Sequence, residues 1–396
     1  MQHGLASPGP GDPLGPLAAE LEALPPERRR RLRALQPHGP AGLAPSPEGR
    51  PLLDLASNDY LGLSRHPRLQ EAARQSIACD GVGAGASRLV SGSRPIHHAL
   101  EQALAQWLGR ERVLLFPSGF QANLAAVQAL ADRHSLVLAD RLIHHSLLVG
   151  VQASGARLRR FRHNDLSDLE AKLQYARADG QAQRRVLVLS ESLFSMEGTC
   201  PDVPRLVALC RKHGAALLLD EAHALGVLGS GGRGLGYGAG EIQLISGTFG
   251  KAFGSGGAFL ACDALVGDWL LQHSGPFRYT TALAPPLAAA ALAAMELIQH
   301  SESQRQRLLE RAERWRSALE AAGWPRPAGF GPVLPLLVGD DQRALDLQQQ
   351  LEAQGLLSVA IRPPTVPSGT ARLRLVLRQD LPEGSLDLLL RALGSA

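Results

Sequence analysis

Lysine is scarce in this 396-residue chain, which contains only Lys172, Lys212 and Lys251 among 41 basic residues. Arginine accounts for the other 38. A guanidinium stays protonated, whereas a lysine amine can lose its proton and act as a nucleophile or base. Each of the three lysines is therefore a candidate nucleophile or base. Lys251 is the strongest candidate, because it lies in the glycine-rich apolar run SGTFGKAFGSGGAFL (246–260).

Cysteine is also rare, and the four cysteines show neither paired nor metal-like spacing. This pattern argues against a disulfide framework and predicts reduced thiols, as in a cytoplasmic protein. The thirteen histidines include no HExxH motif, so we expect no metal site. The four cysteines are Cys79, Cys200, Cys210 and Cys262.

Long apolar runs are absent, and so is a signal peptide in the Pro- and Gly-rich segment 1–16. We therefore expect no membrane association and a cytoplasmic location. A formal net charge of +4 is weak for this length and argues against a nucleic-acid partner. The basic cluster ERRRRLR (27–33) is either a solvated helix face or a contact for an anionic ligand.

Short apolar runs alternate with helical patterns from residue 51 onward and predict an α/β fold with a mostly parallel sheet. We expect an N-terminal segment with a short basic helix (1–50), a large α/β domain (51–286) and a smaller α+β domain (287–396). The helical stretch at 17–35 should break at Pro25 and Pro26, and another helical stretch runs from 287 to about 322. The segment 112–119 is predicted as a strand followed by a turn, and the other predicted strands are 135–140, 185–192, 215–223 and 242–250.

Polar residues gather where these strands end, which is where ligands bind in such folds. A P-loop around Lys251 is excluded, because Ile245 replaces its first glycine and Ala252 follows the lysine. The remaining interpretations are a Schiff-base lysine, whose small neighbours admit a flat cofactor, and a surface lysine in a glycine-rich loop.

Asp220 ends the apolar run LLLD, thirty-one residues before Lys251. A buried carboxylate needs a cationic partner, and the protonated ring nitrogen of pyridoxal 5′-phosphate (PLP) is one such partner. The alternative is an aspartate that caps the following helix. In PSGFQAN (117–123) the free N–H groups at a helix start could bind a phosphate, and Thr248 could add a hydroxyl. The same residues are also typical of an ordinary strand–helix turn that binds nothing.

Two glycine-rich segments mimic other motifs. GSGGRG (229–234) matches a dinucleotide-binding fingerprint but lacks the preceding strand and the following helix. GVGAGAS (81–87) also lacks a strand before it and is interpreted as a tight connection near a ligand.

Eight motifs together resemble those of the PLP-dependent α-oxoamine synthase family, from about Leu21 to the C-terminus. The resemblance implies an aspartate aminotransferase-like fold, PLP as cofactor and a homodimer with shared active sites. The motifs, in family order, are SNDYLGL (57–63), GVGAGASRLVSG (81–92), FPSGFQAN (116–123), ADRLIHHSL (139–147), ESLFSMEG (191–198), LLLDEAHALG (217–226), TFGKAFGSGG (248–257) and AIRPPTVPSGTARLRL (360–375).

The resemblance also implies roles for individual residues. Lys251 would carry the cofactor aldehyde and act as acid and base at the substrate Cα, and Asp220 would pair with the ring nitrogen. His144 would stack on the ring, with a further part in catalysis and substrate binding, and His223 would lie near the ring hydroxyl and also take part in catalysis. The other implied cofactor-binding residues are Ser195 near the ring hydroxyl, Gly119, Phe120 and Thr248 at the phosphate, and Thr280 or Thr281 reaching over the phosphate of the second subunit.

For the substrates, the resemblance implies that Asn58 and Arg374 bind the amino-acid carboxylate and that Thr365 lies at a substrate position. Among the arginines at 28–33, Arg33 aligns best with the family residue that binds the acyl-CoA, and Arg31 less well. The motifs favour the branch that joins L-alanine to a pimeloyl thioester, carried by CoA or a carrier protein. A branch using glycine with acetyl-CoA or succinyl-CoA, and a non-catalytic phosphate- or nucleotide-binding α/β protein, remain as alternatives.

Overall fold

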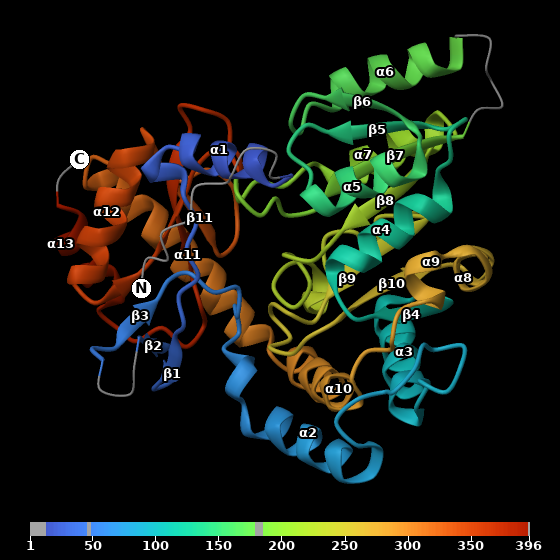
Figure 1. Ribbon diagram of the computed structural model, residues 1–396, viewed down its shortest axis with the longest axis horizontal. Helices are drawn as coiled ribbons and strands as arrows, with labels where there is room; N and C mark the ends of the chain where they lie inside the picture. The colour runs from blue at the N-terminus through green and yellow to red at the C-terminus, as the bar shows by residue number, and fades with distance from the viewer. Residues whose placement is uncertain (1–12, 46–48, 179–184, 395–396) are drawn as a thin grey trace.

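The computed structural model describes residues 13–45, 49–178 and 185–394. Figure 1 shows two halves, a larger one built on a central sheet and a smaller one that brings the N-terminal strands together with the C-terminal helices. The chain links the halves through α10 and α11; in that view α11 runs diagonally from the smaller half down towards α10.

The central sheet has seven strands in the order β4-β10-β9-β8-β7-β5-β6. Every pairing is parallel except those of β10, which runs antiparallel to β4 and β9. The mostly parallel sheet predicted from the apolar runs is confirmed. The strands are β4 (Arg112–Phe116), β5 (Leu136–Asp140), β6 (Arg157–Phe161), β7 (Val186–Glu191), β8 (Ala216–Asp220), β9 (Leu244–Thr248) and β10 (Ala258–Cys262).

Helices cover both faces of this sheet, as alternating side chains along the strands require. In β7, Leu187 and Leu189 join the core beneath α4, α5 and α8, whereas Val186 and Val188 join the core beneath α6 and α7. The helices of this half are α2 (Pro67–Asp80), α3 (Pro95–Leu108), α4 (Gly119–Leu130), α5 (His145–Ser154), α6 (Leu166–Ala178), α7 (Val203–Lys212), α8 (Ala264–His273) and α9 (Gly275–Arg278).

Two smaller sheets form the second half. One has the order β1-β2-β3-β12 and pairs β3 with β12 in parallel, so the N-terminal segment and the C-terminal part of the chain share a sheet. The other has the order β11-β14-β13 and is antiparallel. The remaining strands are β1 (Gln36–His38), β2 (Gly42–Ala44), β3 (Leu52–Asp54), β11 (Val333–Gly339), β12 (Leu356–Leu357), β13 (Val359–Ile361) and β14 (Ala371–Val376).

The remaining helices include the link between the halves. The helical stretch predicted at 287–322 is two helices, because the Ser301 hydroxyl and the Arg305 guanidinium bind the carbonyls of Leu297 and Ile298 and end the first. The division of the chain at residues 50 and 286 stays a prediction. The remaining helices are α1 (Gly15–Ala23), α10 (Pro285–Gln299), α11 (Glu302–Ala321), α12 (Asp341–Ala353) and α13 (Ser385–Leu393), with the 3-10 turns η1 (Pro26–Arg28), η2 (Leu63–Arg65) and η3 (Ser230–Gly232).

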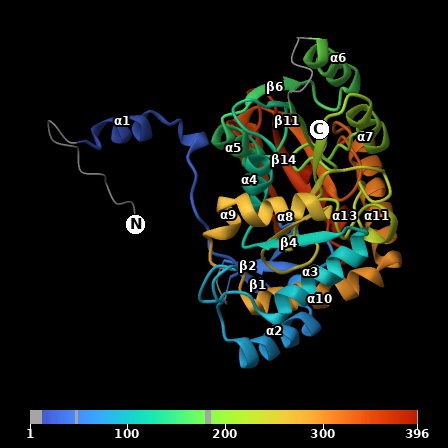
Figure 2. The same ribbon diagram turned by 90° about the vertical axis from the view of Figure 1, so that its right-hand side faces the viewer.

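The basic segment at 27–33 does not form the helix predicted for it. Only one 3-10 turn follows Pro25, and the chain then stays non-helical up to β1. The two prolines break the helix, and the arginine side chains then reach to the C-terminal part: Arg28 Nε lies 3.2 Å from an Asp341 oxygen and Arg33 Nη1 lies 2.6 Å from a Glu352 oxygen. Figure 2 shows α1 set apart from the rest of the molecule.

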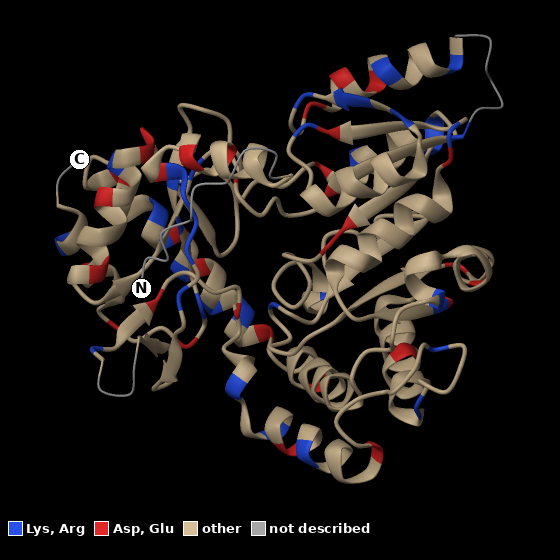
Figure 3. Cartoon of the chain, in the orientation of Figure 1, with Lys and Arg blue, Asp and Glu red and all other residues tan. Residues whose placement is uncertain are grey.

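Charge is mixed over the molecule, with Lys and Arg interspersed among Asp and Glu in both halves (Figure 3). Within the described residues, no helix is both long and apolar enough to span a bilayer. The same residues include no group of three or more His, Cys, Asp or Glu side chains that could bind a metal ion.

Candidate active site

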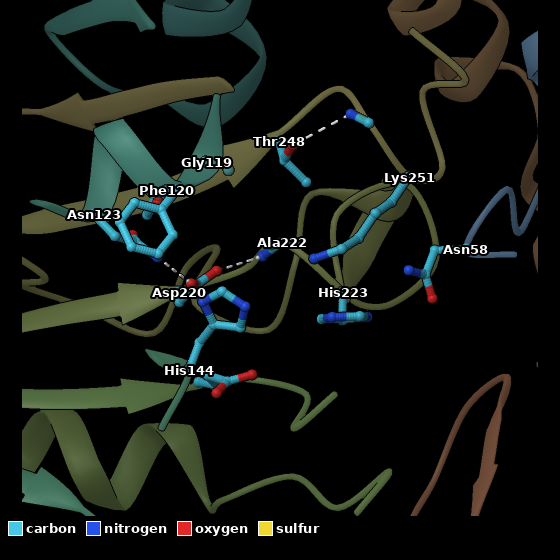
Figure 4. Close-up of a pocket in the computed structure, with 14 residues that line it drawn as sticks. Asn58, Gly119, Phe120, Asn123, His144, Asp220, Ala222, His223, Thr248 and Lys251 are labelled. Atoms are coloured by element: carbon cyan, nitrogen blue, oxygen red, sulfur yellow. Dashed lines mark hydrogen bonds between the residues drawn. The ribbon is translucent and has the colours of Figure 1, made fainter. Parts of the chain in front are cut away.

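A pocket opens at the carboxyl ends of β7, β8 and β9, beside the first turn of α4 (Figure 4). Parallel strands bring their carboxyl ends to one edge of a sheet, so residues far apart in the sequence meet there. Eight of the residues singled out from the sequence line this pocket. The full lining consists of Asn58, Gly119, Phe120, Asn123, His144, Glu191, Asp220, Ala222, His223, Ser246, Gly247, Thr248, Gly250 and Lys251.

Lys251 follows β9 and extends its amine into the pocket (Figure 4). Burial lowers the pKa of this amine to about 8; the charges of Asp220 and Glu191 oppose the shift, and that of Arg374 adds to it. A tight turn holds the lysine in place, because the Gly254 N–H donates to the Lys251 carbonyl at 2.8 Å. Gly254 has a φ of +61°, and a Cβ there would lie 2.3 Å from the Ser64 nitrogen, so only glycine fits.

Asp220 ends β8 and is 5% exposed. One carboxylate oxygen accepts a hydrogen bond from Asn123 Nδ2 at 2.8 Å, and the other accepts one from the Ala222 N–H at 2.9 Å. These two donors stabilise the charged form of a buried carboxylate. Asp220 can therefore serve as a fixed negative charge in the pocket.

Asn123 was not predicted from the sequence as a site residue, although it ends the motif PSGFQAN. Its Nδ2 also donates to Ser146 Oγ at 2.9 Å, and Ser146 Oγ lies 2.7 Å from His144 Nδ1. Asp220, Asn123, Ser146 and His144 thus form one hydrogen-bonded chain. Burial lowers the pKa of His144, with the charge of Asp220 opposing, which favours a neutral ring beside the pocket.

His223 lies three residues after Asp220 and is 6% exposed. Its Nδ1 lies 2.6 Å from the hydroxyl of Tyr60, a fully buried residue that the sequence analysis did not single out. Burial, with added repulsion from Lys251, Arg374 and His144, lowers the pKa of His223 well below its ordinary value. Tyr60 belongs to the motif SNDYLGL, which was the one sequence signal for it. A buried tyrosine hydroxyl needs a hydrogen-bond partner, and here that partner is His223.

Glu191 was also missed, although it opens the motif ESLFSMEG. It ends β7 directly beside Asp220 on β8 and is 2% exposed. Burial and the neighbouring Asp220 charge raise the pKa of Glu191 well above its ordinary value. Within the described chain its Oε1 atom has no hydrogen-bond partner. The sheet therefore places two buried carboxylates side by side, and their repulsion favours the protonated form of Glu191.

The opposite end of the pocket is formed by the N-terminus of α4, whose first N–H groups have no partner inside the helix. A Cβ built on Gly119 would contact only Thr248 within 4 Å, so space remains in front of the helix. The Thr248 hydroxyl donates to the Gly257 carbonyl at 3.0 Å and accepts from the Gly250 N–H at 3.2 Å. Such a helix start suits a phosphate group.

Arg374 approaches the pocket from β14 in the other half of the molecule and is 7% exposed. Its Nε donates to the Ser195 carbonyl at 2.6 Å, and its Nη2 donates to Asn58 Oδ1 at 2.9 Å. Asn58 lines the pocket, so these three residues meet at its edge. A guanidinium held in this way can bind a carboxylate.

Thr280 and Thr281 lie beside the pocket rather than in its lining. The Thr280 hydroxyl accepts a 3.5 Å hydrogen bond from Gln121 Nε2 on α4, and Thr281 forms a β-bridge with Ser87. The segment 81–87, predicted to be a tight connection near a ligand, therefore lies against the chain that leads into α10. Its Ala86 carbonyl accepts from the Ala282 N–H at 3.0 Å.

Arg33 and Thr365 are not brought to this pocket. Arg33 lines a separate surface hollow together with Arg50 and Glu352. Thr365 is exposed, and its N–H donates to the Arg362 carbonyl at 3.1 Å in a surface turn.

The structure around GSGGRG (229–234) lacks the elements of a dinucleotide-binding site. It follows the turn after β8 and contains only the short η3. The chain after it is held by the buried Glu221 carboxylate, which accepts from the N–H groups of Leu235 and Gly236. The segment is thus packed around a structural carboxylate, without the strand and helix that the nucleotide-binding alternative requires.

Comparison with known proteins identifies the family. Residues 50–393 match the family model described as aminotransferase class I and II. The chain is 43% identical over 383 residues to the 8-amino-7-oxononanoate synthase of Pseudomonas fluorescens, covering 95% of each chain.

Solved structures show the same fold. The serine palmitoyltransferase of Sphingomonas wittichii is 29% identical, covers 96% of each chain and superposes with a TM-score of 0.88. A serine palmitoyltransferase from S. paucimobilis, solved with a bound PLP–myriocin aldimine, is 27% identical, covers 96% of each chain and has a TM-score of 0.87. The aminotransferase-like fold predicted from the motifs is confirmed. The chain therefore belongs to the class I and II aminotransferase family and, within it, to the 8-amino-7-oxononanoate synthases.

Proposed function

We propose that this protein binds PLP and condenses L-alanine with a pimeloyl thioester, giving 8-amino-7-oxononanoate, carbon dioxide and the free thiol. The observation that carries the proposal is the meeting of the Lys251 amine and the Asp220 carboxylate in one pocket, in a chain of this family. The acyl carrier is CoA or a carrier protein. A cytoplasmic location, expected from the composition, is part of the same proposal.

The residues of the pocket fit PLP. The Lys251 amine is available for the aldehyde, and the Asp220 carboxylate, held by two donors, matches a protonated ring nitrogen. The start of α4, with Gly119, Phe120 and the nearby Thr248, provides N–H groups and space for the phosphate. His144, Asp220 and Ala222 all line the pocket, and the His144 ring lies close to Asp220 (Figure 4). When bound, PLP supplies an electron sink for charge developing at the amino-acid Cα.

Lys251 moves the proton at the substrate Cα. With a pKa lowered to about 8 by burial, a larger fraction of this amine is unprotonated near neutral pH than of an exposed lysine, and that fraction accepts the proton. The same amine returns a proton after carbon dioxide leaves.

Asn58 and Arg374 bind the substrate carboxylate in this proposal. Arg374 is already oriented by the Ser195 carbonyl and Asn58 Oδ1, so little rotamer freedom is lost when a carboxylate arrives. His223, which lines the pocket, and Ser195, whose carbonyl binds Arg374, would lie near the ring hydroxyl of the bound cofactor. Arg33 stays predicted as an acyl-CoA contact and Thr365 as a substrate position; both lie outside the pocket lining.

A homodimer completes the proposal. Several large apolar side chains beside the pocket are exposed, on segments tied together by the Ser87–Thr281 bridge and the Gln121–Thr280 hydrogen bond. Covering them with a second copy would remove apolar surface from water. The family resemblance adds the expectation that Thr280 and Thr281 reach over the phosphate bound by that copy. The exposed side chains are Val82 (74%), Leu89 (52%), Val90 (79%), Phe120 (43%), Tyr279 (78%) and Leu287 (40%).

Thiol release by the purified, PLP-loaded protein tests the proposal. We expect release with L-alanine plus pimeloyl-CoA, and no release with glycine plus acetyl-CoA or succinyl-CoA. Release only with glycine would move the protein to another branch of the family while keeping the roles of Lys251 and Asp220. No release with any pair, including a pimeloyl-carrier protein, would overturn the proposed reaction.

A further inference from the structure

The Tyr60 hydroxyl lies between His223, which is buried in the pocket wall, and Asn58, which is half-buried and accepts a hydrogen bond from Arg374. Its side chain is fully buried, and its hydroxyl oxygen lies 2.6 Å from His223 Nδ1 and 3.4 Å from Asn58 Oδ1. The Tyr60 backbone is also fixed, because its N–H donates to the Asn58 carbonyl at 2.8 Å and its carbonyl accepts from the Gln379 N–H at 2.7 Å. The hydroxyl therefore has a defined position against His223.

The protonation states of the two side chains restrict how they can share a proton. Burial raises the pKa of Tyr60 to about 12, against the opposing charge and hydrogen bond of Arg374, so the hydroxyl keeps its proton. Burial, together with Lys251, Arg374 and His144, lowers the pKa of His223 well below its ordinary value, so the imidazole is neutral. A neutral imidazole has one N–H donor and one acceptor nitrogen.

Geometry decides where the Tyr60 proton points. His223 Nδ1 is the nearer acceptor at 2.6 Å, whereas Asn58 Oδ1 is 3.4 Å away and already accepts from Arg374 Nη2 at 2.9 Å. The Tyr60 hydroxyl therefore donates to Nδ1, and the ring proton of His223 is on Nε2.

The Nε2 atom has no hydrogen-bond partner among the residues that the structure describes, and His223 lines the pocket beside Lys251. An N–H donor without a protein partner at this place is available to a bound molecule. The acceptor it suits is an oxygen that carries negative charge.

We propose that Tyr60 is a positioning residue, which holds His223 as the Nε2–H tautomer so that the imidazole donates a hydrogen bond to an anionic oxygen of the molecule bound beside Lys251. The identity of that oxygen rests on the proposed function, in which it belongs to the cofactor ring. The tautomer itself is a property of the chain and can be measured without any cofactor.

Nitrogen NMR on the full chain, labelled with ¹⁵N-histidine, tests the tautomer before and after removal of PLP. The resonance lost in His223→Gln identifies His223, and protonated and unprotonated ring nitrogens have well-separated shifts. We expect Nε2 protonated and Nδ1 unprotonated in the wild-type protein. A protonated Nδ1 would overturn the proposal, and this measurement needs no Tyr60 variant to fold.

Tyr60→Phe then removes only the hydroxyl and keeps the buried ring. We expect a mixture of the two tautomers of His223 in this variant, and an unchanged tautomer would contradict the proposal. Tyr175→Phe, at a 52% exposed tyrosine on α6, is the matched control and should leave His223 unchanged.

Kinetics separate positioning from a purely structural role. We expect Tyr60→Phe to lower kcat about tenfold while the KM for the amino acid stays within about twofold, because a misplaced donor weakens the transition state. A lowered melting temperature with unchanged kcat would contradict the proposal. If the wild-type protein turns over no substrate pair, the proposed function fails, while the NMR result still decides the tautomer.

Discussion

The pocket around Lys251 and the arginine segment at 28–33 place their polar side chains in opposite ways. In the pocket, Asp220 and Glu191 end buried strands, and the sheet register fixes them side by side. In the arginine segment, Arg28 and Arg33 reach from a non-helical chain to acidic residues on α12, with side chains 39% exposed in both cases.

The difference shows what fixes a side chain in space. A residue at the end of a buried strand is placed by the whole core, so its position follows from the apolar runs that build the sheet. A surface arginine is placed by whichever acid or carbonyl it meets, and such contacts contribute little free energy. Variants of the pocket should therefore have large effects, and variants of the arginine segment small ones.

The largest effect is expected for Lys251→Ala. We expect kcat to fall by at least about 10³-fold, because this change removes the amine that holds the aldehyde and moves the Cα proton. Borohydride reduction should attach the cofactor covalently to the wild-type protein and not to the variant. Lys212→Ala is the matched control, because Lys212 is 62% exposed and pairs with Glu170 on the surface. An equal loss of kcat in both variants would contradict the expected difference between a pocket lysine and a surface lysine.

A smaller loss, about 10²-fold in kcat, is expected for Asp220→Asn, which keeps the shape of the side chain and removes its charge. The control is Asp202→Asn, at the N-cap of α7, where the carboxylate accepts from the Arg205 N–H at 3.0 Å. Steady-state kinetics with both substrates measure the effect. Unchanged kcat in Asp220→Asn would show that the buried charge has no part in the reaction.

Lys251 should also show its lowered pKa directly. A buried lysine whose pKa is about 8 is mostly protonated below that pH, so its acylation rate in the cofactor-free protein should fall about tenfold for each pH unit below 8. Peptide mapping after timed labelling measures the rate at this lysine alone. A rate that still rises steeply above pH 10 would mean that burial does not lower the pKa.

The smallest effect is expected for Arg33→Ala. The ion pair with Glu352 is partly exposed, so we expect about a threefold rise in the KM for the acyl thioester and no change in the KM for L-alanine. Glu352→Gln, which frees the arginine, is the companion variant and should leave both values unchanged. A rise of about 100-fold for Arg33→Ala would place this arginine among the strong substrate contacts and remove the contrast with the pocket.

Much of the fold could be predicted from the sequence. Strands β4, β5, β7, β8 and β9 were predicted because each is a short apolar run bounded by turn residues. Two strands of the central sheet were missed for opposite reasons. β6 is the arginine-rich run RLRRF at the edge of the sheet, where one side is open to water, and β10 follows the glycine-rich loop without a clear boundary.

The candidate site divides in the same way. Lys251, Asp220 and His223 could be singled out because ionisable side chains in apolar or glycine-rich surroundings need a reason to be there. Asn123, Tyr60 and Glu191 could not, because each is an ordinary residue until the tertiary structure gives it a partner or removes one. Asn123 contacts Asp220 across 97 positions of sequence, and Tyr60 contacts His223 across 163.

The sequence by itself determined the family, the mostly parallel sheet and the lysine–aspartate pair, because these depend on residue type and on periodic burial along the chain. Only the tertiary structure decided that Glu191 lies beside Asp220, that Tyr60 donates to His223, and that Arg28 and Arg33 pair with acidic residues on α12. Each of those outcomes depends on distances between distant segments and on exclusion of water, and neither is a property of a local stretch of sequence.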